Sequence, residues 1–133
     1  MNKIMLDTNI CIYIIKNRPQ NVKKRFETFD VGMLCISSIT VSELMYGVYK
    51  SQYVAKNLKA LESFLMPFEI LPYDYEAATA YGKIRADLER QGRIIGGMDM
   101  LIAAHALSLD MTIVTNNTKE FERVEGLRLE NWV

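Results

Sequence analysis

The chain has 133 residues, of which 50% are hydrophobic and 24% charged, and its formal net charge is zero. This composition is typical of a folded globular protein and excludes a disordered chain, a collagen-like repeat and a coiled coil. The two cysteines are too few for a disulfide framework. The neutral net charge by itself argues against a nucleic-acid-binding protein. Since there is no linker-like stretch, we expect residues 1–133 to form a single domain.

No segment has the character of a membrane span or a signal peptide. The longest apolar run, over residues 10–15, is far shorter than the roughly 20 residues that cross a bilayer. Asp7 lies where a signal peptide would need apolar residues. We therefore expect a cytoplasmic protein without a membrane segment, in which Cys11 and Cys35 are reduced.

Short apolar runs alternate with helical periodicity in the first half of the chain. An apolar run over residues 3–6 predicts a buried strand that stops at Asp7. Residues 8–16 predict a helix capped by Asp7 or Thr8, which ends before Pro19. A basic helix is expected over residues 21–29 and a strand over residues 34–36. Helical spacing of apolar residues then predicts helices over residues 40–49 and 54–65.

The second half continues the alternation. Residues 68–71 predict a strand, and Asp74 can cap a long helix that ends at Gly92. After a loop over residues 93–97, another helix is expected with one apolar face, made of Met98, Leu101, Ile102, His105 and Leu109. Residues 112–114 predict the last strand, and residues 121–132 are a mixed tail. Strands alternating with helices predict an α/β fold, a three-layer α/β/α sandwich with a mostly parallel central sheet.

Polar clusters follow three of the predicted strands, at residues 7–9, 37–38 and 115–117. In a parallel sheet the carboxyl ends of the strands meet at one edge, where binding crevices form. Any one of these clusters can be a helix cap or a turn. Three of them at the same edge favour a functional site.

Four acidic residues are candidates for that site, and each also has a simple structural explanation. Asp7 can be a helix cap. Glu43 can be a surface residue, or can form a capping box with Thr40 three residues earlier. Asp99 lies in the first turn of its helix, where the helix dipole favours an acid. Glu120 can be an ordinary acid of the tail.

Acidic side chains that converge from separate segments are costly unless cations neutralise them. Their oxygen ligands would select Mg²⁺ or Mn²⁺. A site of this kind activates water and stabilises in-line displacement at a phosphodiester.

Four motifs in order resemble the PIN-domain family: MLDTNICIYIIKNRP, SSITVSELMYG, GGMDMLIAAHA and IVTNNTKEFERV. Within that family the sequence resembles the VapC ribonuclease toxins of bacterial VapBC toxin–antitoxin pairs. The resemblance covers residues 5–132 and implies a Mg²⁺- or Mn²⁺-dependent endoribonuclease.

The resemblance also implies the site residues. The family's metal-dependent centre corresponds to Asp7, Glu43 and Asp99, and we expect Asp7 and Asp99 to hold the metal. A fourth family acid aligns best with Asn117, so this chain departs from the family pattern there. Glu120, three residues later, is the candidate that restores the fourth acidic group.

The same resemblance implies partners and a substrate. A VapB-like antitoxin is expected to dock between the predicted helices over residues 40–49 and 54–65, in a groove formed by Met45, Tyr46, Tyr49 and Tyr53. A homodimer is implied, with operator DNA bound only through the antitoxin. The ending TNNTKEFERV and the final ENW resemble toxins that cut initiator tRNA in its anticodon stem-loop.

Two other functions remain open from the sequence. A metal-dependent phosphotransferase would use Asp7 as a covalent nucleophile, but no second aspartate stands at the spacing typical of haloacid-dehalogenase-like enzymes. A degenerate PIN module would bind RNA or a partner without catalysis, and Asn117 is the feature that favours it.

Overall fold

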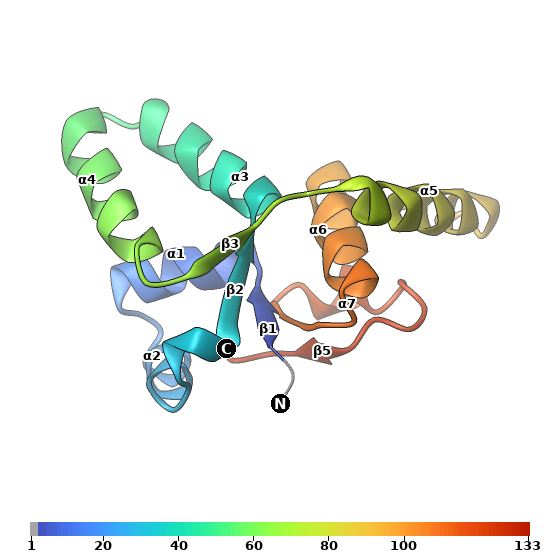
Figure 1. Ribbon diagram of the computed structural model, residues 1–133, viewed down its shortest axis with the longest axis horizontal. Coiled ribbons are helices and arrows are strands. Elements are labelled where there is room, and N and C mark those ends of the chain that lie inside the picture. The colour runs from blue at the N-terminus through green and yellow to red at the C-terminus, as the bar shows by residue number, and fades with distance from the viewer. Residues whose placement is uncertain (1–2) are drawn as a thin grey trace.

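The computed structural model describes residues 3–133 and contains a five-stranded sheet in which every neighbouring pair is parallel (Figure 1). The order across the sheet is β3-β2-β1-β4-β5. The strands are β1 (Ile4–Leu6), β2 (Leu34–Ser37), β3 (Glu69–Leu71), β4 (Thr112–Val114) and β5 (Leu129–Glu130). The predicted parallel sheet is therefore confirmed, and β5 is a strand that the sequence analysis did not predict.

Helices cover both faces of the sheet (Figure 1). On one side lie α1 (Thr8–Lys16), α2 (Gln20–Glu27), α3 (Ser38–Tyr49) and α4 (Val54–Leu65). On the other side lie α5 (Tyr75–Arg90), α6 (Gly97–Ser108) and the short α7 (Thr118–Phe121). A 3₁₀ turn, η1 (Val31–Met33), precedes β2. The three-layer α/β/α sandwich is confirmed.

Alternating side chains of β1 divide the core into two halves. Ile4 and Leu6 pack with the α1–α4 layer, whereas Met5 packs with α5 and α6. Successive side chains of a strand point to opposite faces, so a strand that is apolar throughout serves both layers. Among residues 3–133, none of the helices combines the length and the apolar character needed to cross a bilayer.

The start of α3 differs from the prediction. The hydroxyl of Ser37 caps the helix by accepting a hydrogen bond from the backbone N–H of Ile39 (3.1 Å). Thr40 lies inside the helix and is buried, so the capping box between Thr40 and Glu43 is wrong. The reason is that β2 continues into α3 without a loop. By contrast, the predicted cap of α5 is confirmed, since Asp74 accepts from the N–H of Ala77 (3.0 Å).

The predicted apolar face of α6 is only partly correct. Met98 and Leu109 are 39% and 40% exposed, whereas Ile102 and His105 are buried as expected. The helix also buries small residues that the face omitted, at Ala103, Ala104 and Ala106. Small side chains let α6 approach the sheet and α5 on different sides. A helix buried on several sides has no single apolar stripe to predict.

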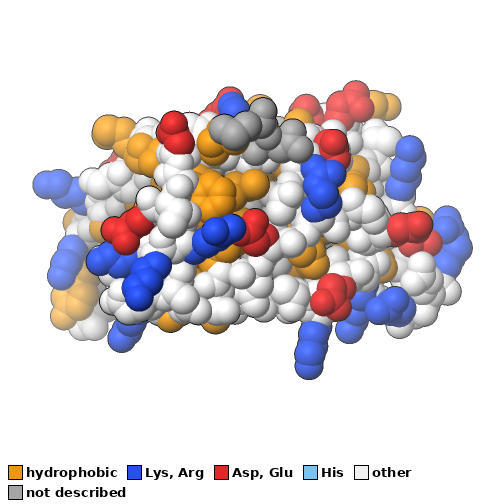
Figure 2. Space-filling view, turned by 90° about the horizontal axis from the view of Figure 1, so that it is seen from below, with side chains coloured by type: hydrophobic (Ala, Val, Ile, Leu, Met, Phe, Trp, Pro, Cys, Tyr) orange, Lys and Arg blue, Asp and Glu red, His pale blue; other side chains and the backbone are white. Residues whose placement is uncertain are grey.

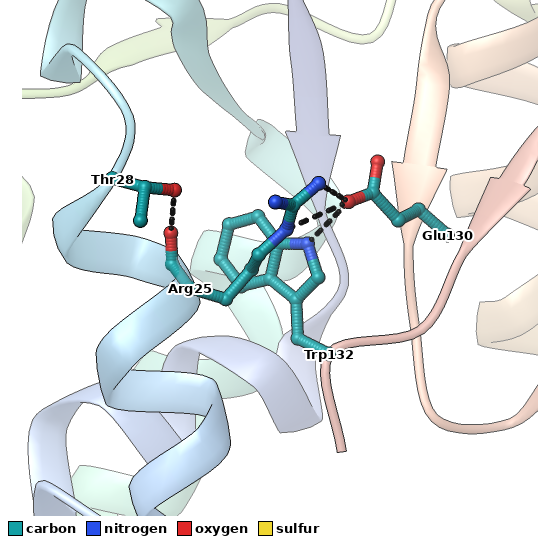
Figure 3. A network of polar contacts seen from close by, with 4 residues as sticks. All are labelled: Arg25, Thr28, Glu130 and Trp132. Carbon is teal, nitrogen blue, oxygen red and sulfur yellow. Dashed lines mark hydrogen bonds and ion pairs between the residues drawn. The ribbon is translucent and has the colours of Figure 1, made fainter.

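A polar cluster attaches the end of the chain to α2 (Figure 3). The Arg25 guanidinium donates to Glu130 Oε1 (2.7 Å from Nη2), and the indole N–H of Trp132 donates to the same oxygen (3.0 Å). The Trp132 ring is buried and stacks on Phe29 with centroids 5.3 Å apart. These contacts attach β5 and the end of the chain to α2 and the segment that follows it.

We expect Trp132→Ala to lower the free energy of unfolding by about 3–5 kcal/mol, because it removes a large buried ring. Urea denaturation followed by circular dichroism measures this change. Lys3→Gln is the control: it breaks an exposed ion pair with Glu69, and such pairs contribute about 0–1 kcal/mol. Equal effects of the two substitutions would contradict a structural role for the Trp132 contacts.

Candidate active site

Asp7 is fixed at the carboxyl end of β1, in the middle of the sheet. Its Oδ1 accepts a hydrogen bond from the N–H of Thr8 (2.8 Å) and caps α1, while its Oδ2 accepts from the hydroxyl of Thr115 (2.7 Å). The side chain is only 3% exposed. The pKa of Asp7 is raised above its ordinary value, mainly because the side chain is buried. Hydrogen bonds from Thr115 and Thr8 partly offset this shift, and the charge of Glu43 adds to it.

Glu43 reaches the same edge from α3. Its Oε1 accepts a hydrogen bond from the hydroxyl of Thr8 (2.6 Å), and that hydroxyl also lies 3.4 Å from the hydroxyl of Thr40. Thr8 directly follows Asp7 in the chain. Thr8 therefore binds both carboxylates: its backbone N–H donates to Asp7, and its hydroxyl donates to Glu43.

Asp99 and Glu120 are joined through Asn117. The side-chain amide of Asn117 donates to Asp99 Oδ2 (3.0 Å) and to Glu120 Oε2. The backbone N–H of Asn117 donates to the hydroxyl of Thr115 (3.0 Å), which is the same hydroxyl that binds Asp7. The polar segment after β4 thus connects Asp99 and Glu120 with Asp7.

The charges of these acids act on one another. Burial raises the pKa of Asp99 to about 7, and the charges of Asp7, Glu120 and Glu43 act in the same direction. For Glu120 the hydrogen bond from Asn117 is the main cause of a lowered pKa. The structure therefore brings together the four acids that the sequence singled out. Their catalytic and metal-binding roles stay predictions.

The donor set fits an open two-carboxylate metal site. Asp7 and Asp99 offer the oxygen ligands that Mg²⁺ prefers, and a cation would favour the ionised form of Asp99, whose pKa is raised by burial and by the neighbouring carboxylates. Mg²⁺ is commonly held by one or two protein carboxylates, with waters and substrate phosphates completing its shell. Over residues 3–133, no three His, Cys, Asp or Glu side chains form a group that could hold an ion.

The sequence analysis noted Thr8 as a member of a polar cluster and a possible helix cap, and Thr115 as a member of a polar cluster. The structure shows that their hydroxyls hold the carboxylates of Glu43 and Asp7. Their place at the end of an apolar strand is the signal that was available. Neither hydrogen-bond partner is near in sequence, so these contacts could not be read from spacing.

Similarity to known proteins agrees with this geometry. The model of the PIN domain matches residues 4–127. The chain belongs to the PIN domain family. That assignment confirms the resemblance inferred from the four sequence motifs.

Relatives place this PIN domain in the VapC branch. It is 54% identical to "tRNA(fMet)-specific endonuclease VapC" of Shigella flexneri over 132 residues, which is 99% of each chain. It is 50% identical to "Ribonuclease VapC2" of Haemophilus influenzae over the whole of both chains. A chain of the DNA-bound VapBC structure from Salmonella typhimurium matches with a TM-score of 0.93 and 47% identity, over 100% of each chain.

We expect Asp99→Asn to stabilise the metal-free protein, and more so at pH 8 than at pH 4. The pKa of Asp99 is about 7 in the folded state and about 4 in an unfolded chain. Between about pH 4 and about pH 7 the carboxyl group of Asp99 ionises in the unfolded state but not in the folded state. This ionisation stabilises the unfolded state, so the free energy of unfolding of the native sequence falls as the pH rises. Asparagine does not ionise and avoids this loss.

Urea denaturation in the presence of a chelator, at pH 4, 6 and 8, measures the effect. The control is Glu62→Gln, which replaces an exposed acid of α4 and should change stability little at any of these pH values. A difference between Asp99→Asn and the native sequence that is the same at all three values would contradict the raised pKa.

Proposed function

We propose that this PIN domain is a metal-dependent endoribonuclease toxin that hydrolyses phosphodiester bonds in RNA. The observation that carries the proposal is the convergence of Asp7, Glu43 and Asp99 at the carboxyl edge of the sheet. The Shigella flexneri relative, named as a tRNA(fMet)-specific endonuclease, supports it at 54% identity.

Asp7 and Asp99 would hold a divalent cation, Mg²⁺ or Mn²⁺. When bound, such a cation supplies Lewis acidity that stabilises charge developing on the reacting phosphate. Thr115 and Thr8 orient Asp7 by binding its two oxygens. Glu43 uses Oε1 to bind Thr8, and its Oε2 is available to accept a proton from an attacking water.

The names of the relatives, endonucleases and ribonucleases, favour a nuclease over the phosphotransferase alternative. Glu120, together with Asn117, is the candidate that completes the charge around Asp99, directly or through water.

The substrate we propose is initiator tRNA, cut in its anticodon stem-loop. Relatives from Shigella flexneri and Salmonella typhimurium both carry the name tRNA(fMet)-specific endonuclease. A protein of zero net charge does not hold RNA by bulk electrostatics. Figure 2 shows Lys and Arg interspersed with Asp and Glu on the face it presents. The unpaired bases and shape of a folded loop therefore supply the specificity.

The partner we propose is a VapB-like antitoxin, because solved relatives are VapBC complexes, two of them bound to DNA. A cavity of about 360 Å³ lies between α1, α3 and α4. Its lining is mostly apolar: Ile12, Ile15, Leu44, Val48, Ala60 and Leu61, with Lys16, Gly47 and Asn57. This cavity suits the apolar face of an amphipathic segment.

The cavity differs in its lining from the groove expected in the sequence analysis. Met45, Tyr46, Tyr49 and Tyr53, which were expected to form the groove, are absent from its lining. The three tyrosines are more than 60% exposed. The lining differs because α1, distant in sequence, supplies one wall of the cavity.

Operator DNA would be bound through the antitoxin, and a homodimer stays a prediction.

We expect Asp7→Asn to reduce RNA cleavage by roughly a hundredfold or more, since several kcal/mol of transition-state stabilisation depend on the cation. Chelation of divalent cations should have the same effect on the native sequence. Purified protein and initiator tRNA, followed by electrophoresis, measure both. Circular dichroism should show that the variant remains folded.

The chemistry of the new ends tests the mechanism independently. Hydrolysis by an attacking water leaves a 5′-phosphate and a 3′-hydroxyl. Products that end in a 2′,3′-cyclic phosphate would show that the ribose hydroxyl is the nucleophile and would rule out this mechanism. Intact initiator tRNA beside cut ribosomal RNA in induced cells would show that the substrate is wrong.

We expect Ala60→Trp to weaken antitoxin binding at least tenfold, because an indole would fill the cavity between α1, α3 and α4. Titration of the purified toxin with its cognate antitoxin measures the dissociation constant. Met66→Trp at the end of α4 is the matched control, since Met66 is 83% exposed and does not line the cavity. Equal affinities for both variants would place the antitoxin elsewhere.

A further inference from the structure

Four residues form a stripe along the outer face of α3 that begins in the acidic site. Glu43, Tyr46, Gly47 and Lys50 are spaced i, i+3, i+4 and i+7, so they lie along one side of the helix. Leu44, which lines the same cavity as Gly47, is buried in the core. We call these four residues the α3 stripe. It leads away from Glu43, the acid that Thr8 holds at the sheet edge.

The α3 stripe combines an exposed aromatic ring, a cation and uncovered backbone. Tyr46 is 66% exposed, and the Lys50 ammonium lies 4.8 Å from the centroid of its ring. A Cβ added at Gly47 would meet no atom within 4 Å, so the space above the helix is open there. Aromatic rings and cations are the groups with which proteins bind unpaired nucleotides.

Lys50 differs from several of the arginines in its pairing. Arg25, Arg85 and Arg128 each form an ion pair with a carboxylate. Within residues 3–133, Lys50 makes no ion pair and contacts the ring of Tyr46 instead. A cation on the same side of α3 as Glu43, about 10 Å further along the helix and not paired with a carboxylate, is placed to attract a phosphate.

We propose that the α3 stripe binds unpaired nucleotides of the RNA next to the bond that is cut. A base stacks on Tyr46, and Lys50 contacts a phosphate. By helix geometry Tyr46 and Lys50 lie about 4.5 Å and about 10 Å further along the axis than Glu43. The stripe thus orients the strand that enters the acidic site. This inference rests on the proposed ribonuclease function.

Tyr46→Leu tests the stacking contact, and Tyr46→Phe tests whether the ring alone restores it. Both are made in the Asp7→Asn background, so that the RNA stays intact during the measurement. Fluorescence anisotropy with the anticodon stem-loop of initiator tRNA gives the dissociation constant. We expect Tyr46→Leu to weaken binding about tenfold or more and Tyr46→Phe to recover most of the loss. A fully paired RNA of equal length should not distinguish the variants.

Lys50→Gln tests the phosphate contact. It should reduce the slope of log affinity against log salt by about one, as expected for one lost phosphate contact. Lys59→Gln on the exposed side of α4 is the matched control, because Lys59 lies outside the α3 stripe. The slope of log affinity against log salt for Lys59→Gln should equal that of the parent protein, which carries Asp7→Asn alone.

The proposal is overturned if Tyr46→Leu binds the stem-loop as tightly as its parent. It is equally overturned if Tyr46→Leu leaves RNA binding intact but alters self-association or antitoxin affinity, because the stripe would then be a protein interface. In both cases the native sequence would still cleave RNA, and the proposed function would stand. Absence of any cleavage by the native sequence would instead overturn the proposed function and this inference together.

Discussion

The hydrogen bond from Thr115 to Asp7 joins the ends of β1, the central strand, and its neighbour β4 at the edge where the acids gather. Its two residues follow directly on β1 and β4, whose register pairs Leu6 with Val114. Asp7 is buried in the middle of the sheet, so its charge needs donors that belong to the fold. Thr115 also accepts from Asn117, which in turn binds Asp99. The placement of the acids therefore depends on strand register as much as on their own helices.

Much of this arrangement was predictable because polar residues mark the ends of three short apolar runs that form strands. Asp7 and Thr115 come directly after short apolar runs, and parallel strands bring such positions to one edge. The helices over residues 8–16 and 54–65 agree with the structure at both ends. Local signals of this kind, caps and apolar runs, require no knowledge of the tertiary structure.

The details that failed depend on contacts between distant segments. Thr40 resembles a helix cap, but β2 runs straight into α3 and Ser37 takes that position. The α6 face was misjudged because Ala103 and its neighbours are buried by α5 as well as by the sheet. The lining of the cavity beside α3 and α4 was not predicted, because one of its walls is α1. Periodicity along one segment does not report which other segment will cover it.

The proposed cation site has a physical cost, because burial and the mutual repulsion of the acids both disfavour their ionised forms. Burial and three neighbouring carboxylates raise the pKa of Asp99 to about 7. The most direct test is a ¹³C NMR titration of the Asp99 carboxyl group, with and without Mg²⁺. The account predicts a pKa near 7 without the cation and a clear fall when Mg²⁺ is added, because the cation favours the ionised carboxylate. An Asp99 pKa that is the same with and without Mg²⁺ would contradict it.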